Sequence, residues 1–233
     1  PDEPGHLFAK TKTINYHFDD KGYEEVAIAQ EEARSLAVKL AMAIALADDS
    51  LDDSEVTIIK DWIRRTTAPY PDEKQKALNK LFNTSVKEAY ADAKSGSLTL
   101  SDITERMNEI GEEPQKLEAI ELCFDVMAAD GVADESELQT IKNIAKALEL
   151  DYDEIERMRD KRLIKLDVAI EQQASIETIL GIEPDWSNDQ TKKHLRDEFA
   201  KWNNRLNTLG EGEERDNAQR MLDMISEART KYA

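Results

Sequence analysis

The stretch Ala-Asp-Asp-Ser-Leu-Asp-Asp-Ser-Glu, residues 47–55, is the part of the chain that decides the fold. It returns at residues 129–137 as Ala-Asp-Gly-Val-Ala-Asp-Glu-Ser-Glu, and both copies run on to an Ile-Lys pair at Ile59-Lys60 and Ile141-Lys142. We call these stretches the first and the second acidic elbow. Each elbow lies between two apolar helical stripes, so the repeat predicts two helix–elbow–helix units related by a pseudo-twofold axis.

The residues around each elbow have the spacing of amphipathic helices, in which apolar side chains recur every three or four positions. The stripes that precede the elbows are Ala33, Leu36, Ala37, Leu40, Ala41, Ile44 and Ala45, and Leu117, Ile120, Phe124, Met127 and Ala128. The stripes that follow are Val56, Ile59, Trp62 and Ile63, and Leu138, Ile141, Ala145 and Leu148. Further helices are predicted from Asp72 to Ser95, from Ser101 to Gly111, and from Asp151 to about residue 174. With 35% charged and 6% aromatic residues, the chain is predicted to be all-α.

The charge of the chain is strongly negative and unevenly distributed. The formal net charge is −19 over 233 residues. Residues 1–183 hold 22 Lys and Arg against 40 Asp and Glu, or −18, whereas residues 184–233 hold 9 against 10, or −1. Nucleic-acid binding needs a basic footprint, so this composition argues against it and favours cations, basic protein partners or solubility.

The change in composition near residue 183 divides the chain. We predict an N-terminal arm (1–25), a helical domain (26–160), a helical connector (161–174) and a second helical unit (175–233). In the last unit, two stripes predict a helical hairpin: Leu195, Phe199, Trp202, Leu206 and Leu209, and then Ala218, Leu222, Ile225 and Tyr232.

A single cysteine, Cys123, lies on an apolar stripe and is predicted to be a buried thiol, which fits a reducing compartment. No run approaches the roughly 20 apolar residues of a membrane span. We therefore expect a cytoplasmic protein, or the soluble part of a longer one, since the chain begins with Pro1 rather than Met.

The clustered carboxylates of the elbows predict a divalent-cation site. Hard cations bind several oxygen ligands, and a pseudo-twofold axis can bring two acidic triplets together. The candidate ligands are Asp48, Asp52 and Glu55 in the first elbow and Asp130, Asp134 and Glu137 in the second. Helix capping is the alternative for four of them, because Asp52-x-x-Glu55 and Asp134-x-x-Glu137 are close to capping boxes. Capping does not explain Asp48 and Asp130, because an acid at a helix C-terminus opposes the helix dipole.

An EF-hand is excluded at both elbows. Counting Asp48 as position 1 puts Ile59 at position 12, where an EF-hand carries a bidentate Glu. Asp130 leads in the same way to Ile141.

At these residues the sequence resembles the TerB family of tellurite-resistance proteins and the related central region of DjlA-type proteins. The resemblance rests on two apolar helices that end in Ala-Asp and on the Asp-x-x-Glu start of each following helix, and it covers roughly residues 26–160. It implies an all-helical fold with internal symmetry and a divalent cation, with calcium as the expected ion, held by the six acidic residues named above. Asp49 stands where the second elbow has Gly131, which puts equal roles of the two halves in doubt.

The tail resembles a degenerate J-domain, and a TerB-like region followed by a J-domain is the order of DjlA-like proteins. Ile179–Ile182 resembles the opening turn, Lys192–Leu206 the second helix and Ala218–Tyr232 the third. The loop between the helices lacks the His-Pro-Asp motif with which J-domains stimulate a DnaK-type ATPase, and any amphipathic hairpin would look similar.

Three functions follow. The first is a non-catalytic cation-binding scaffold for protein partners in a stress-resistance or defence system. The second is a chaperone-associated adaptor that acts through the tail, and the third is a carboxylate metalloenzyme. The sequence contains no nucleophile elbow and no phosphate-binding glycine loop, so we expect no enzymatic activity. His194 is expected to be an exposed helix residue.

Overall fold

The computed structural model describes residues 22–47, 51–129, 135–163 and 176–233. Within these ranges the chain forms ten α-helices and no strand, which confirms the predicted all-α fold. The first seven helices are α1 (Tyr23–Ile44), α2 (Asp53–Thr67), α3 (Asp72–Ser95), α4 (Leu100–Ile110), α5 (Glu113–Met127), α6 (Glu135–Ala147) and α7 (Tyr152–Leu163). The remaining three are α8 (Ile176–Ile179), α9 (Asn188–Leu206) and α10 (Glu213–Lys231). The predicted N-terminal arm falls almost entirely outside the described residues.

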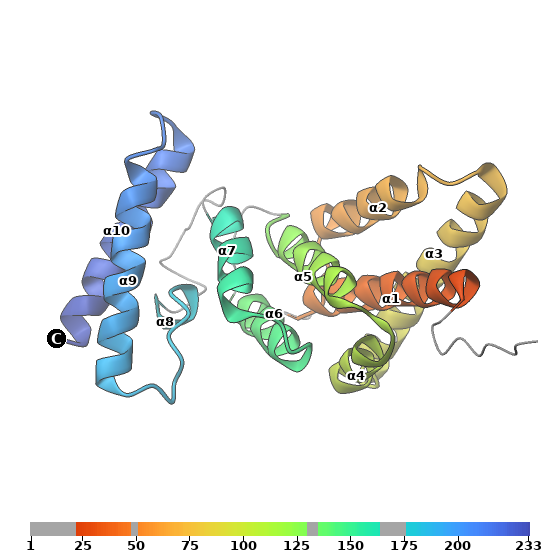
Figure 1. Cartoon of the computed structure of the whole chain (residues 1–233), viewed down its shortest axis with the longest axis horizontal. Coiled ribbons are helices and arrows are strands. Elements are labelled where there is room, and N and C mark those ends of the chain that lie inside the picture. The colour runs from red at the N-terminus through yellow and green to blue at the C-terminus, as the bar shows by residue number, and fades with distance from the viewer. Residues whose placement is uncertain (1–21, 48–50, 130–134, 164–175) are drawn as a thin grey trace, which may run out of the picture.

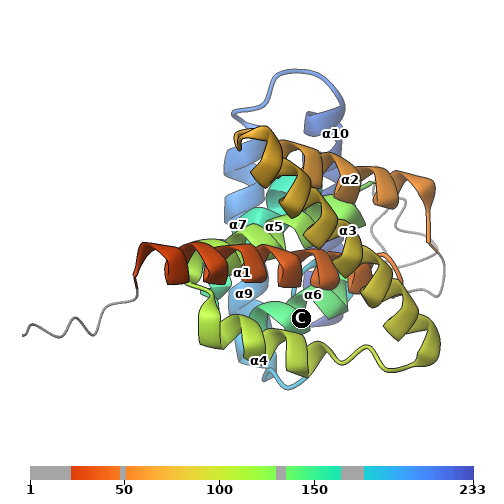
Figure 2. The same cartoon turned by 90° about the vertical axis from the view of Figure 1, so that its right-hand side faces the viewer.

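Helices α1 and α5, which lead into the two elbows, form the centre of a bundle that comprises α1–α7. They pack on one another, and α1 also packs on α3 and α4. Helix α5 also contacts α2, α6 and α7. Figures 1 and 2 both show α1 between α2 on one side and α4 on the other. The two helices that lead into the elbows therefore build the core together, and the pseudo-twofold relation of the two units stays a prediction.

The core of the bundle comes from the predicted apolar stripes. Leu40 and Ile44 of α1, Ile120 of α5 and Ile141 of α6 are each at most 1% exposed. A buried hydrogen bond of 2.6 Å between the hydroxyls of Ser35 and Ser85 joins α1 to α3. Full burial of such aliphatic side chains stabilises the fold by about 1.5–3 kcal/mol each.

The helix ends follow local sequence signals. Gly96 ends α3 with φ of 72°, a left-handed conformation that glycine adopts at little steric cost. Pro71 precedes Asp72 at the start of the same helix. Both ends of α3 were therefore predictable from sequence.

The C-terminal helices lie at the far end of the molecule from α3 (Figure 1). Helices α9 and α10 pack along one another, α10 contacts α8, and α8 contacts α6 of the bundle. Leu195, Trp202, Ala218 and Ile225 are at most 1% exposed, which confirms the predicted hairpin. The domain boundaries at residues 160 and 175 stay predictions, because most of the connector lies outside the described residues. Among those residues, no helix is long and apolar enough to cross a membrane.

Candidate functional site

The first elbow ends in the predicted capping box. The backbone N–H of Ser54 donates to Asp52 Oδ1 at 2.7 Å, and the backbone N–H of Asp52 donates to Glu55 Oε2 at 2.9 Å. Hydrogen bonds from the hydroxyl and the backbone N–H of Ser54 hold the pKa of Asp52 below its ordinary value. The capping function of Asp52 and Glu55 is thus confirmed.

Glu55 and Glu137 occupy equivalent positions in the two halves, and both are 8% exposed. Glu55 lies in the first turn of α2 and Glu137 near the start of α6, and both helices pack on α5. Asp52, by contrast, is exposed. Carboxylates are rarely so buried unless they are paired or hydrogen-bonded. Burial therefore distinguishes the glutamates from the capping aspartate.

The other three predicted ligands, Asp48, Asp130 and Asp134, lie outside the described residues. Among the described residues, Asp52, Glu55 and Glu137 do not form a group of three potential ligands within reach of one ion. The six-residue cation site stays a prediction.

A dense cluster of charged side chains joins α7 to α9, and the sequence analysis missed it. Arg159 donates to Asp160 Oδ1 from Nε at 3.2 Å and from Nη2 at 2.9 Å. Lys201 Nζ lies 2.6 Å from Asp160 Oδ2 and 2.5 Å from Glu198 Oε1. The side chains of Arg159, Asp160 and Glu198 are only 9%, 4% and 5% exposed. We call Glu156, Arg159, Asp160, His194, Glu198 and Lys201 the junction cluster.

The junction cluster keeps its cations charged. Burial lowers the pKa of Arg159, but the attraction of Asp160, Glu156 and Glu198 outweighs it and raises the pKa overall. Burial likewise lowers the pKa of Lys201, and Asp160 and Glu198 raise it above the ordinary 10.5. A raised lysine pKa stabilises the folded state below pH 10.5, and this contribution is lost only as the pH rises through the folded value.

His194 is half-buried at this junction, so its predicted exposure was wrong. Its Nε2 lies 2.8 Å from the carbonyl oxygen of Leu180. Its ring packs edge-on against the ring of Trp186, with the two ring centroids 4.8 Å apart. The spacing of His194, Glu198 and Trp202 at i, i+4 and i+8 placed them on one helical face. No pattern in the sequence indicates that this face meets α7.

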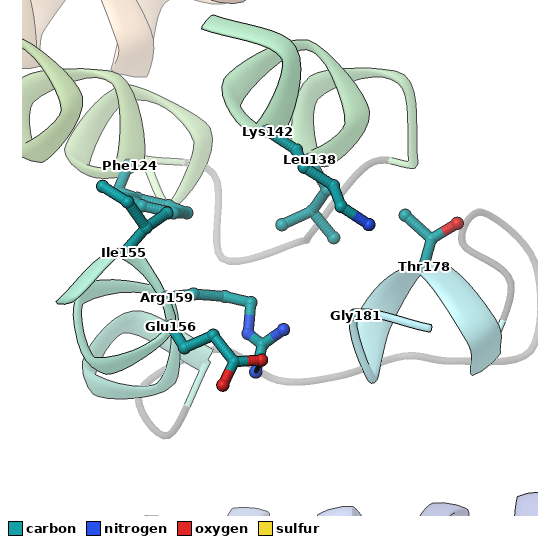
Figure 3. A pocket seen from close by; sticks show the side chains of 8 residues that line it. All are labelled: Phe124, Leu138, Lys142, Ile155, Glu156, Arg159, Thr178 and Gly181. Carbon is teal, nitrogen blue, oxygen red and sulfur yellow. Dashed lines mark ion pairs between the residues drawn. The ribbon is translucent and has the colours of Figure 1, made fainter. Parts of the chain in front are cut away.

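Two cavities adjoin the junction. The smaller, of about 40 Å³, lies between α5, α6, α7 and α8 (Figure 3). Phe124, Leu138 and Ile155 line its apolar side, and Arg159 and Lys142 extend into it from two helices. The second cavity, of about 340 Å³, lies beside Lys142, which forms a 2.7 Å ion pair with Glu183. Ligand pockets usually span about 300–1,000 Å³, so the smaller cavity holds at most a water molecule or two.

Cys123 is fully buried, as predicted. Desolvation raises the pKa of its thiol well above the ordinary value. A thiol is reactive as the thiolate, so Cys123 is part of the core rather than a nucleophile.

Comparison with known proteins gives one family. The family model of the tellurite resistance protein TerB matches residues 35–160. No curated protein and no solved structure matches the chain. The matched range begins within α1 and ends at Asp160 in α7, so it covers most of the bundle and stops inside the junction cluster. Since this range is more than half of the chain, and since it contains both elbows of the internal repeat, the protein belongs to the TerB family of tellurite resistance proteins.

Proposed function

We propose that the protein is a non-catalytic, divalent-cation-binding TerB module that serves as a scaffold for protein partners in a stress-resistance or defence system of the cytoplasm. The observation that carries this proposal is the equal burial of Glu55 and Glu137, one after each elbow. Burying an ionised carboxylate is costly unless a cation or hydrogen-bond donors compensate it. Glu55 already accepts a hydrogen bond from the backbone N–H of Asp52, and a cation shared by the two elbows would add to such compensation at both glutamates.

The residues of the elbows suit a hard cation. All six candidates are carboxylates, and calcium takes six to eight oxygen ligands at about 2.3–2.6 Å. Asp48 and Asp130 are the candidates that helix capping does not explain. We therefore propose calcium as the ion and Asp48, Asp52, Glu55, Asp130, Asp134 and Glu137 as its ligands, with Asp52 and Glu55 also capping α2.

A scaffold, rather than an enzyme, fits the electrostatics of the molecule. A net charge of −19 favours association with basic surfaces and with cations. The 340 Å³ cavity is lined by polar and apolar side chains of α6, by Leu150, Ile155 and Glu183, and by neither of the two elbow glutamates. We propose that the acidic surface and the C-terminal hairpin supply contacts for partner proteins.

Calcium is expected to raise the thermal stability of the full chain. A ligand that binds only the native state stabilises it by about 2.7 kcal/mol at a hundredfold excess over Kd. The double variant Asp48→Asn/Asp130→Asn should lose this increment, because each substitution removes one negative ligand. Differential scanning calorimetry with and without millimolar calcium, magnesium or manganese measures the effect.

The matched control is Asp53→Asn, which removes the same charge from an exposed residue at the start of α2. It should keep the full calcium response. A melting temperature that ignores all three cations, or a response that survives in the double variant, contradicts the cation site and leaves the elbows as capped turns.

The alternative is an adaptor that uses the J-like tail, and the observation that favours it is the packed α9–α10 hairpin. We expect this tail not to stimulate a DnaK-type ATPase. The segment between α9 and α10 reads Asn-Thr-Leu-Gly-Glu-Gly, residues 207–212, without the His-Pro-Asp motif. A single-turnover ATPase assay, with a J-domain that carries the motif as positive control, measures this. Stimulation close to that control would contradict the scaffold proposal and make the protein a co-chaperone.

A further inference from the structure

We propose a second metal site, formed by Glu156 of α7 and His194 and Glu198 of α9, that takes a transition metal ion such as Zn²⁺ and fastens the C-terminal hairpin to the TerB domain. The three side chains each offer one ligand atom, and these atoms lie within 4.8 Å of one another. Zinc bonds to nitrogen and carboxylate oxygen at about 2.0–2.2 Å, so ligand atoms on one ion are at most about 4.4 Å apart. A small side-chain adjustment therefore brings all three onto a common ion.

The hydrogen bond of His194 prepares its ring for a metal. A carbonyl oxygen only accepts, so the 2.8 Å contact with Leu180 requires the proton on Nε2. In the neutral ring this leaves the lone pair of Nδ1 free to bind a cation. Metal-ligating histidines usually donate their other N–H to a carbonyl or carboxylate, which fixes the tautomer and the ring orientation. The edge-on contact with Trp186 holds the ring in the same position.

The junction cluster contains one more carboxylate than it contains permanent cations. Three carboxylates (Glu156, Asp160, Glu198) face two permanent cations, Arg159 and Lys201. With a neutral His194 the cluster carries a net charge of −1. Zn²⁺ brings two positive charges, so its binding would change the net charge of the cluster from −1 to +1 and give the buried carboxylates a further cationic partner.

The two permanent cations contact Asp160 and also the two proposed glutamate ligands, so a metal ion would share these carboxylates with Arg159 and Lys201. Both hydrogen bonds of Arg159 go to Asp160 Oδ1, while its Nη2 lies 3.3 Å from Glu156 and 3.8 Å from Glu198. Lys201 Nζ forms ion pairs with Asp160 Oδ2 and with Glu198 Oε1. Glu156 Oε1 is buried and accepts no hydrogen bond, and Arg159 Nη2 forms an ion pair with this same oxygen at 3.3 Å. Glu198 Oε2 accepts one from Trp202 Nε1 at 3.1 Å and retains acceptor capacity.

The ligand set selects the ion. One imidazole with two carboxylates suits zinc, iron, nickel and similar ions, whereas calcium takes oxygen ligands only. This site is therefore chemically distinct from the proposed calcium site of the elbows. Because its ligands come from α7 and α9, metal binding adds to the ion pairs that join these helices.

Isothermal titration of the full chain with Zn²⁺, and visible absorption after Co²⁺ substitution, test the proposal. We expect one site whose Zn²⁺ affinity falls at least about tenfold in His194→Gln, since loss of even a second-shell partner costs about 10–100-fold. Gln can still donate to the Leu180 carbonyl, and circular dichroism checks that the variant folds. The matched control is Asp197→Asn, which changes an exposed acid beside Glu198 and should leave the affinity unchanged.

Three results would overturn the proposal: no Zn²⁺ binding to the wild type, equal binding by His194→Gln, or equal loss in Asp197→Asn. The Asp48→Asn/Asp130→Asn variant should keep the zinc site, so its result is independent of the calcium proposal.

Discussion

Replacing Arg159 by alanine is expected to lower the free energy of unfolding by about 3–5 kcal/mol, because removing one partner of a buried ion pair leaves its partner charge uncompensated. Asp160 would lose both guanidinium hydrogen bonds while remaining buried. Glu156 would lose the cation 3.3 Å from its Oε1, and Glu198 would lose the weaker of its two ion pairs and keep the one with Lys201. Lys201 alone would then face three carboxylates.

Urea denaturation followed by circular dichroism measures this loss. The control is Arg157→Ala, because Arg157 is an exposed residue of the same helix and its change should stay within about 0.5 kcal/mol. Limited proteolysis adds a local measurement, since loss of the junction should make the α9–α10 hairpin more susceptible to cleavage. Equal stability of the two variants would show that the junction cluster does not hold the hairpin in place.

Replacing Phe82 by alanine is expected to destabilise the TerB bundle by about 3–5 kcal/mol, through lost burial and the cavity left behind. Phe82 of α3 is fully buried, and its ring lies 6.0 Å from that of Trp62 in α2, centroid to centroid, at an angle of 57°. Helix α3 packs on both α1 and α2, so it covers the two helices that flank the first elbow. Such aromatic pairs contribute about 0.5–1.5 kcal/mol of stability beyond the contribution of the apolar area that they bury.

Leu81→Ala is the matched control for Phe82→Ala. Leu81 precedes Phe82 on the same helix but is 38% exposed, so its truncation removes less buried surface and leaves no cavity. Thermal and urea unfolding of both variants measure the difference. A loss in Leu81→Ala as large as in Phe82→Ala would contradict the assignment of this stability to the buried ring of Phe82, because alanine is itself the best helix former.

Features that depend on spacing along one helix were predictable from the sequence. Cys123 and Trp202 lie on apolar stripes and are buried, as predicted. Asp52 and Glu55 form the capping box that Asp-x-x-Glu encodes, because both partners belong to the same helical turn. The helices of the repeat begin and end close to the predicted residues for the same reason.

The burial of the elbow glutamates was not predictable, because it depends on a second helix. Glu55, Glu137 and Asp52 are all acidic residues at the start of a helix, so the sequence alone does not distinguish them. Only the packing of α2 and α6 on α5 separates the buried carboxylates from the exposed one.

The amino-acid sequence alone determined the helices, their caps and the apolar stripes of the hairpin, because each is encoded by neighbours within a few residues, and it also shows the repeat directly, as a motif that recurs 82 residues later. The tertiary structure alone decided where the charged faces of α7 and α9 meet. Glu156 and His194 are far apart in sequence, and neither helix carries a signal for the other. Their proximity follows from the docking of the C-terminal hairpin on the TerB bundle, and buried groups at such a contact must compensate one another because water no longer does so.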